Sequence, residues 1–219
     1  MGEAHLQLRT SLSKNIHPNF KPSSINKLQE PLSRKILQTE DKDILEKFRI
    51  EGTKQLAFNL LIRKYQKRVY WLARKMVIDH DDANDISQEV FVKIWFHLDE
   101  FRSESGLFTW IYRIASNECL KVLKKKRLRF FLPIGDVEGE LSDKISSEHH
   151  FTGDEIQRKL QLAILKLPEK QRLVFNMKYF EDITYEEMSG ILGTSVGALK
   201  ASYHHAVQKV QANLESGEI

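Results

Sequence analysis

Carboxylate side chains recur at helical spacing between Asp82 and Glu89. Asp82, Asp85 and Glu89 stand at positions i, i+3 and i+7, so a helix places them on one face, with Gln88 at its border. Such a face repels phosphate and suits a basic protein partner. The simpler alternative is a solvated helix start, where acidic residues are favoured, and charge alone favours that alternative.

An aromatic stretch follows and leads into a basic run. Phe101, Phe108 and Trp110 could stack on unpaired bases. Asn117 has poor propensity for a helix interior, which indicates a functional role. The basic residues that would hold a nucleic-acid backbone include Lys121 and Lys124. Alternatively, Phe108 or Trp110 belongs to a core, and the basic run is a solvated helix end.

The C-terminal part carries the signals of two short helices with a tight turn between them. Thr184 and Glu187 form a capping box, and Gly193 suits the left-handed residue that ends a helix. Thr194 or Ser195 can cap the next helix. The pattern predicts a helix-turn-helix, whereas a helical hairpin inside a core is the alternative.

The second of these helices is expected to enter the major groove of DNA. The residues predicted to face the DNA, with the capping pair, are Thr194, Ser195, Gly197, Ala198, Lys200, Ala201, His204 and His205. Lys200 can contact a phosphate or a guanine. His204 and His205 are adjacent and do not share a helix face, so no metal site is predicted there.

Composition narrows the class of protein. The net charge of the 219 residues is only +4, too small an excess to indicate nucleic-acid binding by itself. One cysteine, Cys119, excludes an intramolecular disulfide framework and a cysteine-rich zinc site. No apolar run is long enough for a membrane span or a secretory signal, so we expect a cytoplasmic protein.

Helical periodicity occupies two stretches of the chain. We expect an all-α fold of two small helical domains, residues 40–129 and 155–215, the second containing the helix-turn-helix. Residues 1–39 are polar, with a basic bias and little sustained periodicity, and are predicted to be a disordered extension. Residues 130–154 are acidic and punctuated by glycines, which predicts a flexible linker.

Three stretches resemble signatures of the sigma-70 superfamily, specifically its extracytoplasmic-function (ECF) group. They are DANDISQEVFVKIW, FRSESGLFTWIYRIASN and LPEKQRLVFNMKYFEDITYEEMSGILGTSVGALK, and they occur in the order that the family shows. The resemblance covers roughly residues 41–214. It implies a sigma factor that binds core RNA polymerase and directs promoter-specific transcription initiation, without enzymatic activity or a cofactor.

The resemblance also implies roles for the residues singled out above. The acidic face from Asp82 to Glu89 would dock on the clamp helices of the polymerase β′ subunit. The aromatic loop and Asn117 would capture a flipped base of the minus-10 element, next to the basic run. The helix-turn-helix would read the duplex minus-35 element and touch the β flap. An anti-sigma protein would hold the free factor inactive. The recognition helix lacks the arginines of many relatives, so the recognised sequence differs from theirs.

Two other classes of protein remain open from the residues alone. A stand-alone helix-turn-helix regulator would bind duplex DNA without polymerase, although the acidic face argues against it. An enzyme acting on nucleic acid would use Asp82, Asp85 and Glu89 as metal ligands, yet no partner carboxylate motif or phosphate-binding loop accompanies them.

Overall fold

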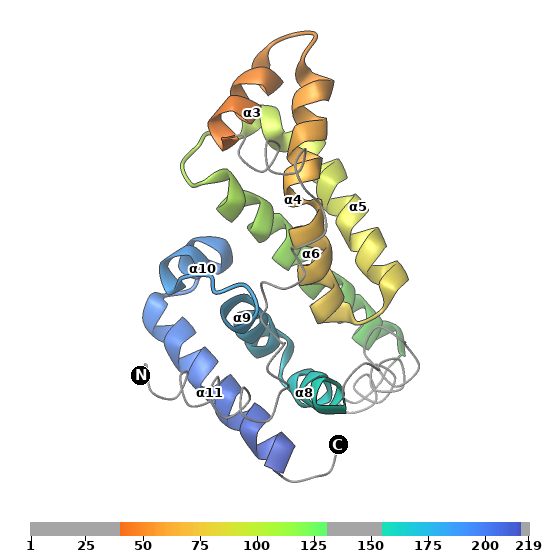
Figure 1. Cartoon of the computed structure of the whole chain (residues 1–219), viewed down its shortest axis with the longest axis vertical. Helices are drawn as coiled ribbons and strands as arrows, with labels where there is room; N and C mark the ends of the chain where they lie inside the picture. The colour runs from red at the N-terminus through yellow and green to blue at the C-terminus, as the bar shows by residue number, and fades with distance from the viewer. Residues whose placement is uncertain (1–39, 131–154, 216–219) are drawn as a thin grey trace.

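The computed structural model describes residues 40–130 and 155–215 (Figure 1). All regular structure within these ranges is helical, which confirms the all-α fold class. In chain order it comprises α3 (Asp41–Arg49), α4 (Lys54–Val77), α5 (His80–His97), the short 3-10 helix η2 (Leu98–Glu100), α6 (Leu107–Phe130), α8 (Glu155–Leu165), α9 (Glu169–Tyr179), α10 (Tyr185–Leu192) and α11 (Val196–Glu215). The expected extension (1–39) and nearly all of the expected linker (130–154) lie outside the described residues.

A sharp reversal joins α4 to α5. Ile78 ends α4 with φ 62°, a region that a β-branched residue rarely adopts, and the amide of Asp79 donates to the carbonyl of Val77 at 2.7 Å. The Asp79 carboxylate then accepts from the amide of Asp82 at 2.9 Å and caps α5. The helix therefore begins at His80.

The C-terminal helices follow their sequence signals closely. Thr184 and Glu187 form the predicted capping box, and α10 ends at Gly193 with φ 62° and ψ 29°. Ser195, of the two candidates, caps α11, because its hydroxyl accepts from the amide of Ala198 at 3.3 Å. These local bonds fix the tight turn, so the predicted helix-turn-helix is present.

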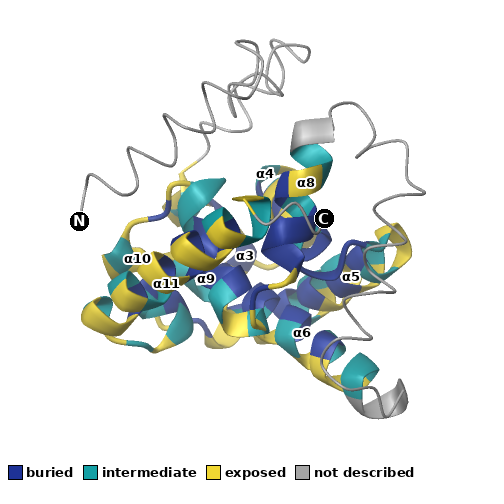
Figure 2. Cartoon of the chain, turned by 90° about the horizontal axis from the view of Figure 1, so that it is seen from below, coloured by how far each residue is buried: buried dark blue, intermediate teal, exposed yellow. Residues whose placement is uncertain are grey.

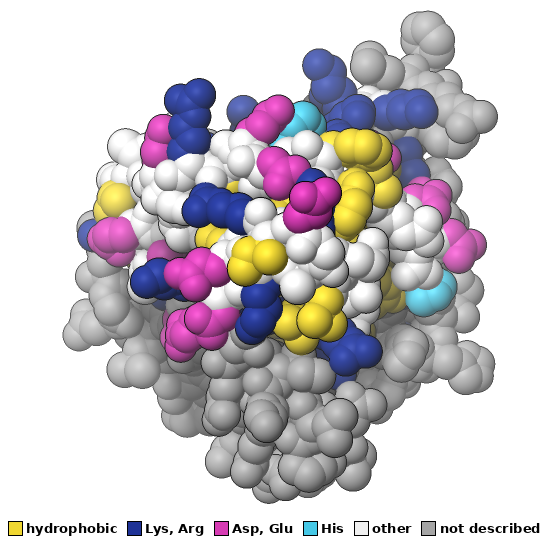
Figure 3. Space-filling model, turned by 90° about the horizontal axis from the view of Figure 1, so that it is seen from above, with side chains coloured by type: hydrophobic (Ala, Val, Ile, Leu, Met, Phe, Trp, Pro, Cys, Tyr) yellow, Lys and Arg dark blue, Asp and Glu magenta, His cyan; other side chains and the backbone are white. Residues whose placement is uncertain are grey.

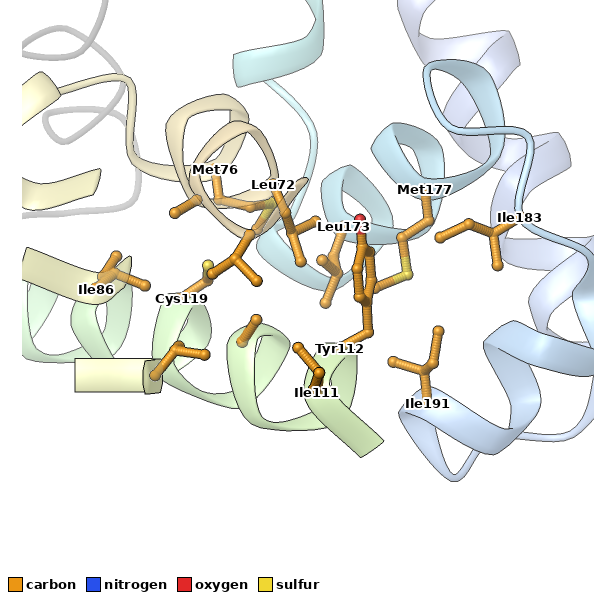
Figure 4. Packing of buried hydrophobic residues seen from close by; sticks show 14 of the residues in the cluster. Leu72, Met76, Ile86, Ile111, Tyr112, Cys119, Leu173, Met177, Ile183 and Ile191 are labelled. Atoms are coloured by element: carbon orange, nitrogen blue, oxygen red, sulfur yellow. The ribbon is translucent and has the colours of Figure 1, made fainter. Parts of the chain in front are cut away.

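Buried side chains from both halves of the chain form one continuous core. Figure 4 shows Leu72 and Met76 of α4 close to Leu173 of α9, with Tyr112 of α6 between the two halves. Figure 2 shows the buried faces of the helices turned inward and the exposed faces outward. Although the sequence suggests two domains on a tether, the helices on either side of the expected linker pack directly against each other.

Polar contacts reinforce this packing at the end of α4. The Arg172 guanidinium donates to the carbonyl oxygen of Met76 at 3.1 Å, and the Asn176 amide donates to the carbonyl oxygen of Lys75 at 3.3 Å. The last carbonyls of a helix have no partner within the helix itself. Side chains of α9 therefore cap the C-terminus of α4.

The opposite end of the molecule carries α3. Figure 3 looks onto this end and shows hydrophobic side chains between basic and acidic ones. Exposed hydrophobic residues of α4 and α5 include Leu56, Val92 and Phe96. Within the two described ranges, no helix combines the length and apolar character that crossing a bilayer requires.

Candidate functional site

The acidic residues of α5 do not form one uniform face. Asp82 is half-buried and ion-paired with Lys126 of α6. Asp85, Gln88 and Glu89 are exposed, and Glu89 lies 3.6 Å from Lys93. The structure thus leaves Asp85, Gln88 and Glu89 exposed, whereas Asp82 is bound to a neighbouring helix.

An apolar groove of about 790 Å³ borders this exposed face. Its walls come from α4 and α5, and its side chains include Phe58, Ile62, Tyr70, Phe91, Val92, Trp95 and Phe96. Gln88 belongs both to the acidic face and to the groove lining. This groove was not predicted from the sequence. The apolar residues of α5 at positions 91, 92, 95 and 96 do form a second apolar stripe in the sequence, beside the stripe that is buried in the core.

The aromatic residues divide into two separate clusters. Phe101 is only 6% exposed and packs on Trp110, with ring centroids 5.2 Å apart. Phe108 packs instead on Tyr112, at 4.2 Å between ring centroids. Phe101 therefore contributes to the core in this structure, while Phe108 and Trp110 are half-buried and keep part of their rings accessible.

Exposed polar and basic side chains line one side of α6. Arg113, Asn117, Lys121 and Lys124 are all exposed and recur at spacings of four, four and three residues, which a helix places on one side. Arg113 donates from its guanidinium to the carbonyl oxygen of Gly190 in α10, at 2.5 Å. The structure therefore brings Asn117, Lys121 and Lys124 together and shows that α10 lies beside the start of this line.

A charged cluster joins α4, α6 and the α9–α10 connection. The Tyr112 hydroxyl donates to the Glu181 carboxylate, which lies 3.6 Å from the Arg68 guanidinium. Arg68 also lies over the Phe108 ring, 4.4 Å from its centroid. Burial, with the nearby Glu181, raises the pKa of Tyr112 well above its ordinary value, so its hydroxyl stays protonated and remains a donor.

Sequence reasoning missed the residues of this cluster. Arg68 stands outside the quoted stretches, Glu181 lies inside the third without a predicted role, and Tyr112 reads as one more core aromatic. For the neighbouring basic surface of α6, the sequence did contain a signal: Arg113 precedes Asn117 by one helical turn. That spacing could have extended the predicted basic surface by one residue.

The predicted recognition surface of α11 is largely open. Ser195, Gly197, Ala198, Ala201, His204 and His205 are exposed, whereas Thr194 and Lys200 are half-buried. The Lys200 ammonium lies 5.7 Å from the centroid of the Tyr185 ring. Gly197, Ala198 and Ala201 make this side of α11 a surface of small exposed residues.

Within residues 40–130 and 155–215, no group of three His, Cys, Asp or Glu side chains gathers in a way that could hold a metal ion. Cys119 is fully buried in the core, and burial raises the pKa of its thiol to about 12.

These surfaces define an all-α protein in which a helix-turn-helix packs on a second helical unit. Two family models match the chain, Sigma-70 region 2 over residues 61–129 and Sigma-70 region 4 over residues 157–210. The RNA polymerase sigma-H factor of Pseudomonas aeruginosa is 30% identical, with 82% of this chain and 96% of that protein covered.

Further relatives agree with this match. The ECF RNA polymerase sigma factor SigW of Bacillus subtilis is 29% identical, over 78% of this chain and 98% of the relative. The ECF RNA polymerase sigma-E factor of Escherichia coli K12 is 29% identical, over 81% and 96%. The chain belongs to the sigma-70 family of RNA polymerase sigma factors, in its ECF group. It is therefore a transcription initiation factor, a class of regulator distinct from enzymes.

Solved structures show the same fold. The sigma factor RpoE, in complex with the anti-sigma factor NepR from Bartonella quintana, aligns with a TM-score of 0.56 and 22% identity, over 74% of this chain and 98% of that chain. CnrH, in complex with the cytosolic domain of CnrY, aligns with the same TM-score and identity, over 86% and 100%.

Proposed function

We propose that this protein binds core RNA polymerase through the exposed face of α5 and directs it to promoters with minus-35 and minus-10 elements. In this proposal Asp85, Gln88 and Glu89 contact the β′ clamp helices, and Asp82 supports them by holding α5 against α6. The groove beside Gln88 extends the contact area. A charged rim next to an apolar strip is the usual anatomy of a specific protein interface.

The minus-10 element binds along α6 in this proposal. The observation that carries it is the line of exposed Asn117, Lys121 and Lys124, which the helical period places on the same side of α6 as the half-buried Trp110. Ammonium groups hold the phosphates, and an unpaired base stacks or is pocketed next to the aromatic rings. Capture of an extruded base favours the open duplex by binding energy alone, without nucleotide hydrolysis.

The minus-35 element binds to α11, which enters the major groove with its N-terminal half at the base edges. Thr194 and Ser195 bond phosphate at the helix start, and Lys200 reaches a phosphate or a guanine. Gly197, Ala198 and Ala201 permit close approach of the backbone, and His204 and His205 extend the surface. The same unit touches the β flap of the polymerase.

The closed packing of α10 beside α6 has to loosen for this activity. Arg113 is occupied by the Gly190 carbonyl, and Phe108 lies under the Arg68 guanidinium. Of the two solved structures described above, RpoE is in complex with the anti-sigma factor NepR, and CnrH is in complex with the cytosolic domain of CnrY. We expect an anti-sigma protein to hold this chain closed in the cytoplasm until polymerase can bind.

The test is run-off transcription with core RNA polymerase on a pool of promoter fragments. We expect promoter-selective transcripts that depend on this protein. Asp85→Ala, Gln88→Ala and Glu89→Ala together should abolish complex formation with core polymerase. Asn117→Ala should leave that complex intact and reduce opening of the duplex at the minus-10 element, measured by the reactivity of unpaired thymines with permanganate.

The matched control for the polymerase contact lies on α3. Asp43→Ala with Glu46→Ala removes two exposed carboxylates from another helix and should leave transcription unchanged. If no transcript and no polymerase complex form, while a footprint on duplex DNA does, the protein is a stand-alone DNA-binding regulator.

A further inference from the structure

The groove between α4 and α5 exposes apolar side chains. Val92 is 49% exposed and Phe96 is 68% exposed, and both line it. Its wall on α4 runs from Phe58 to Tyr70, so its length is about 18 Å, or three turns of a helix. Exposed apolar strips of this kind usually mark a binding surface.

The two rims of the groove have opposite charge. Exposed Arg63 and Lys67 stand on the α4 side, and exposed Asp85 and Glu89 stand on the α5 side. A matching occupant therefore presents apolar side chains at helical spacing and basic side chains towards α5.

The extension at the N-terminus has that composition. Residues 1–39 contain six Lys and Arg against two Glu, an excess equal to the net charge of +4 of the whole chain. Within it, Leu28, Leu32 and Ile36 recur every four residues. On a helix, Lys27 and Lys35 would border one side of this apolar row. A helix that begins at Leu28 has Pro31 in its first turn, where proline is tolerated.

The length of chain before α3 lets this segment reach the groove. The Asp41 carboxylate accepts a hydrogen bond from the Tyr65 hydroxyl at 2.8 Å and pairs with the Lys64 ammonium at 2.8 Å, so the chain enters α3 beside the middle of α4. From Leu32 to Asp41 the chain can reach about 30 Å. A tether of this length gives a high effective concentration at the groove.

We propose that residues 25–37 dock in the α4–α5 groove, with Leu28, Leu32 and Ile36 against Val92, Trp95 and Phe96, and Lys27 and Lys35 towards Asp85 and Glu89. The docked segment covers Gln88 and its neighbours. In this respect the inference rests on the proposed function, because a covered groove weakens binding to polymerase. The docking itself does not depend on that function.

Disulfide trapping in the full chain tests the docking directly. In a Cys119→Ser background, the test variant combines Leu32→Cys with Val92→Cys. The control variant combines Ser33→Cys with Val92→Cys. Position 33 has nearly the same tether length as position 32, but on a helix its side chain points to another side. Mild oxidation should link positions 32 and 92 within one molecule at least about tenfold faster than positions 33 and 92. Equal rates overturn the proposal, and so does a link formed only between two copies.

Trp95 provides a second readout. With Trp71→Phe and Trp110→Phe, Trp95 is the sole remaining tryptophan, and Leu28→Asp with Leu32→Asp should shift its emission to the red. The matched change Leu6→Asp with Leu8→Asp should not. An unchanged spectrum for both pairs overturns the docking.

Affinity for core polymerase separates the two proposals. If the groove is covered nine tenths of the time, Leu28→Asp with Leu32→Asp should tighten binding about tenfold. A trapped disulfide in a protein that binds no polymerase supports the docking and contradicts the proposed function. Polymerase binding without the selective disulfide supports the function and contradicts the docking.

Discussion

The hydroxyl of Tyr112 donates a hydrogen bond to the carboxylate of Glu181, a residue 69 positions later in the chain. Tyr112 lies on α6, beside the half-buried Phe108, and Glu181 lies just before the helix-turn-helix. One hydrogen bond therefore connects the two parts of the molecule for which separate roles at the promoter are proposed. Arg68 completes the contact from α4.

Tyr112→Phe removes this bond, and the Glu181 carboxylate keeps the Arg68 guanidinium but loses the tyrosine donor. Since hydrogen bonds to charged groups contribute about 1.5–3 kcal/mol, we expect a loss of about 2 kcal/mol in the free energy of unfolding. The radius of gyration from solution scattering should rise. Tyr65→Phe is the control, because Tyr65 bonds to Asp41 within the first part of the chain. A rise of equal size in both variants would contradict the assignment.

Gly190→Leu should displace α10 from α6. A Cβ at Gly190 would already stand 3.1 Å from the Thr109 methyl, and a larger side chain cannot fit without movement. Hydrogen exchange in residues 107–113 should accelerate. Gly197→Leu is the control, because nothing lies within 4 Å of a Cβ placed there. Unchanged exchange in Gly190→Leu would show that the contact adapts.

Thr184→Ala removes one half of the capping box on α10. The expected cost is about 1 kcal/mol in the free energy of unfolding, and Thr184→Ser should restore most of it. Thermal melting monitored by circular dichroism measures the difference. Equal melting temperatures for the Ala and Ser variants would show that packing alone sustains the helix.

The Cys119 thiol should be nearly inert in the folded protein. Its pKa is raised by burial to about 12 from an ordinary 9.0, so at pH 8 its thiolate fraction is lower by about a thousandfold. Because the folded-state pKa is raised, the group stays protonated over the whole physiological range. Labelling with a thiol reagent at pH 8 should require unfolding, and rapid labelling of the native protein would contradict the burial.

Lys124→Ala should reduce the salt dependence of binding to a single-stranded minus-10 oligonucleotide. Removal of one phosphate contact lowers the slope of log K against log salt by about 0.7. Titrations at several salt concentrations measure it. Lys42→Ala, an exposed lysine on α3, should leave the slope unchanged. Equal slopes for all three proteins would remove Lys124 from the proposed site.

Local signals account for what the sequence predicted well. The capping box at Thr184, the left-handed Gly193 and the Ser195 cap depend on residues at most four positions apart, so these features can be predicted from a short stretch of sequence. Helical periodicity likewise predicted the fold class. Asp79 and Asp82 both suit an N-cap, and the structure shows that Asp79 caps α5.

Long-range pairings account for what the sequence did not reveal. Arg172 and the carbonyl of Met76 are 96 residues apart, and no local sequence pattern predicts their hydrogen bond. The pairing of Asp82 with Lys126, 44 residues later, removes one carboxylate from a face that looked uniform. An aromatic ring such as Phe101 has the same appearance in a sequence whether it binds a base or fills a core, and here it packs on Trp110.

The capping of α4 by side chains of α9 has a thermodynamic consequence. When Arg172 and Asn176 leave, the carbonyls of Met76 and Lys75 lose their donors, and the apolar surface around Leu72 and Leu173 becomes hydrated at the same time. Melting of either half thus withdraws support from the other. A scanning calorimeter should record one heat-absorption peak, with equal calorimetric and van't Hoff enthalpies.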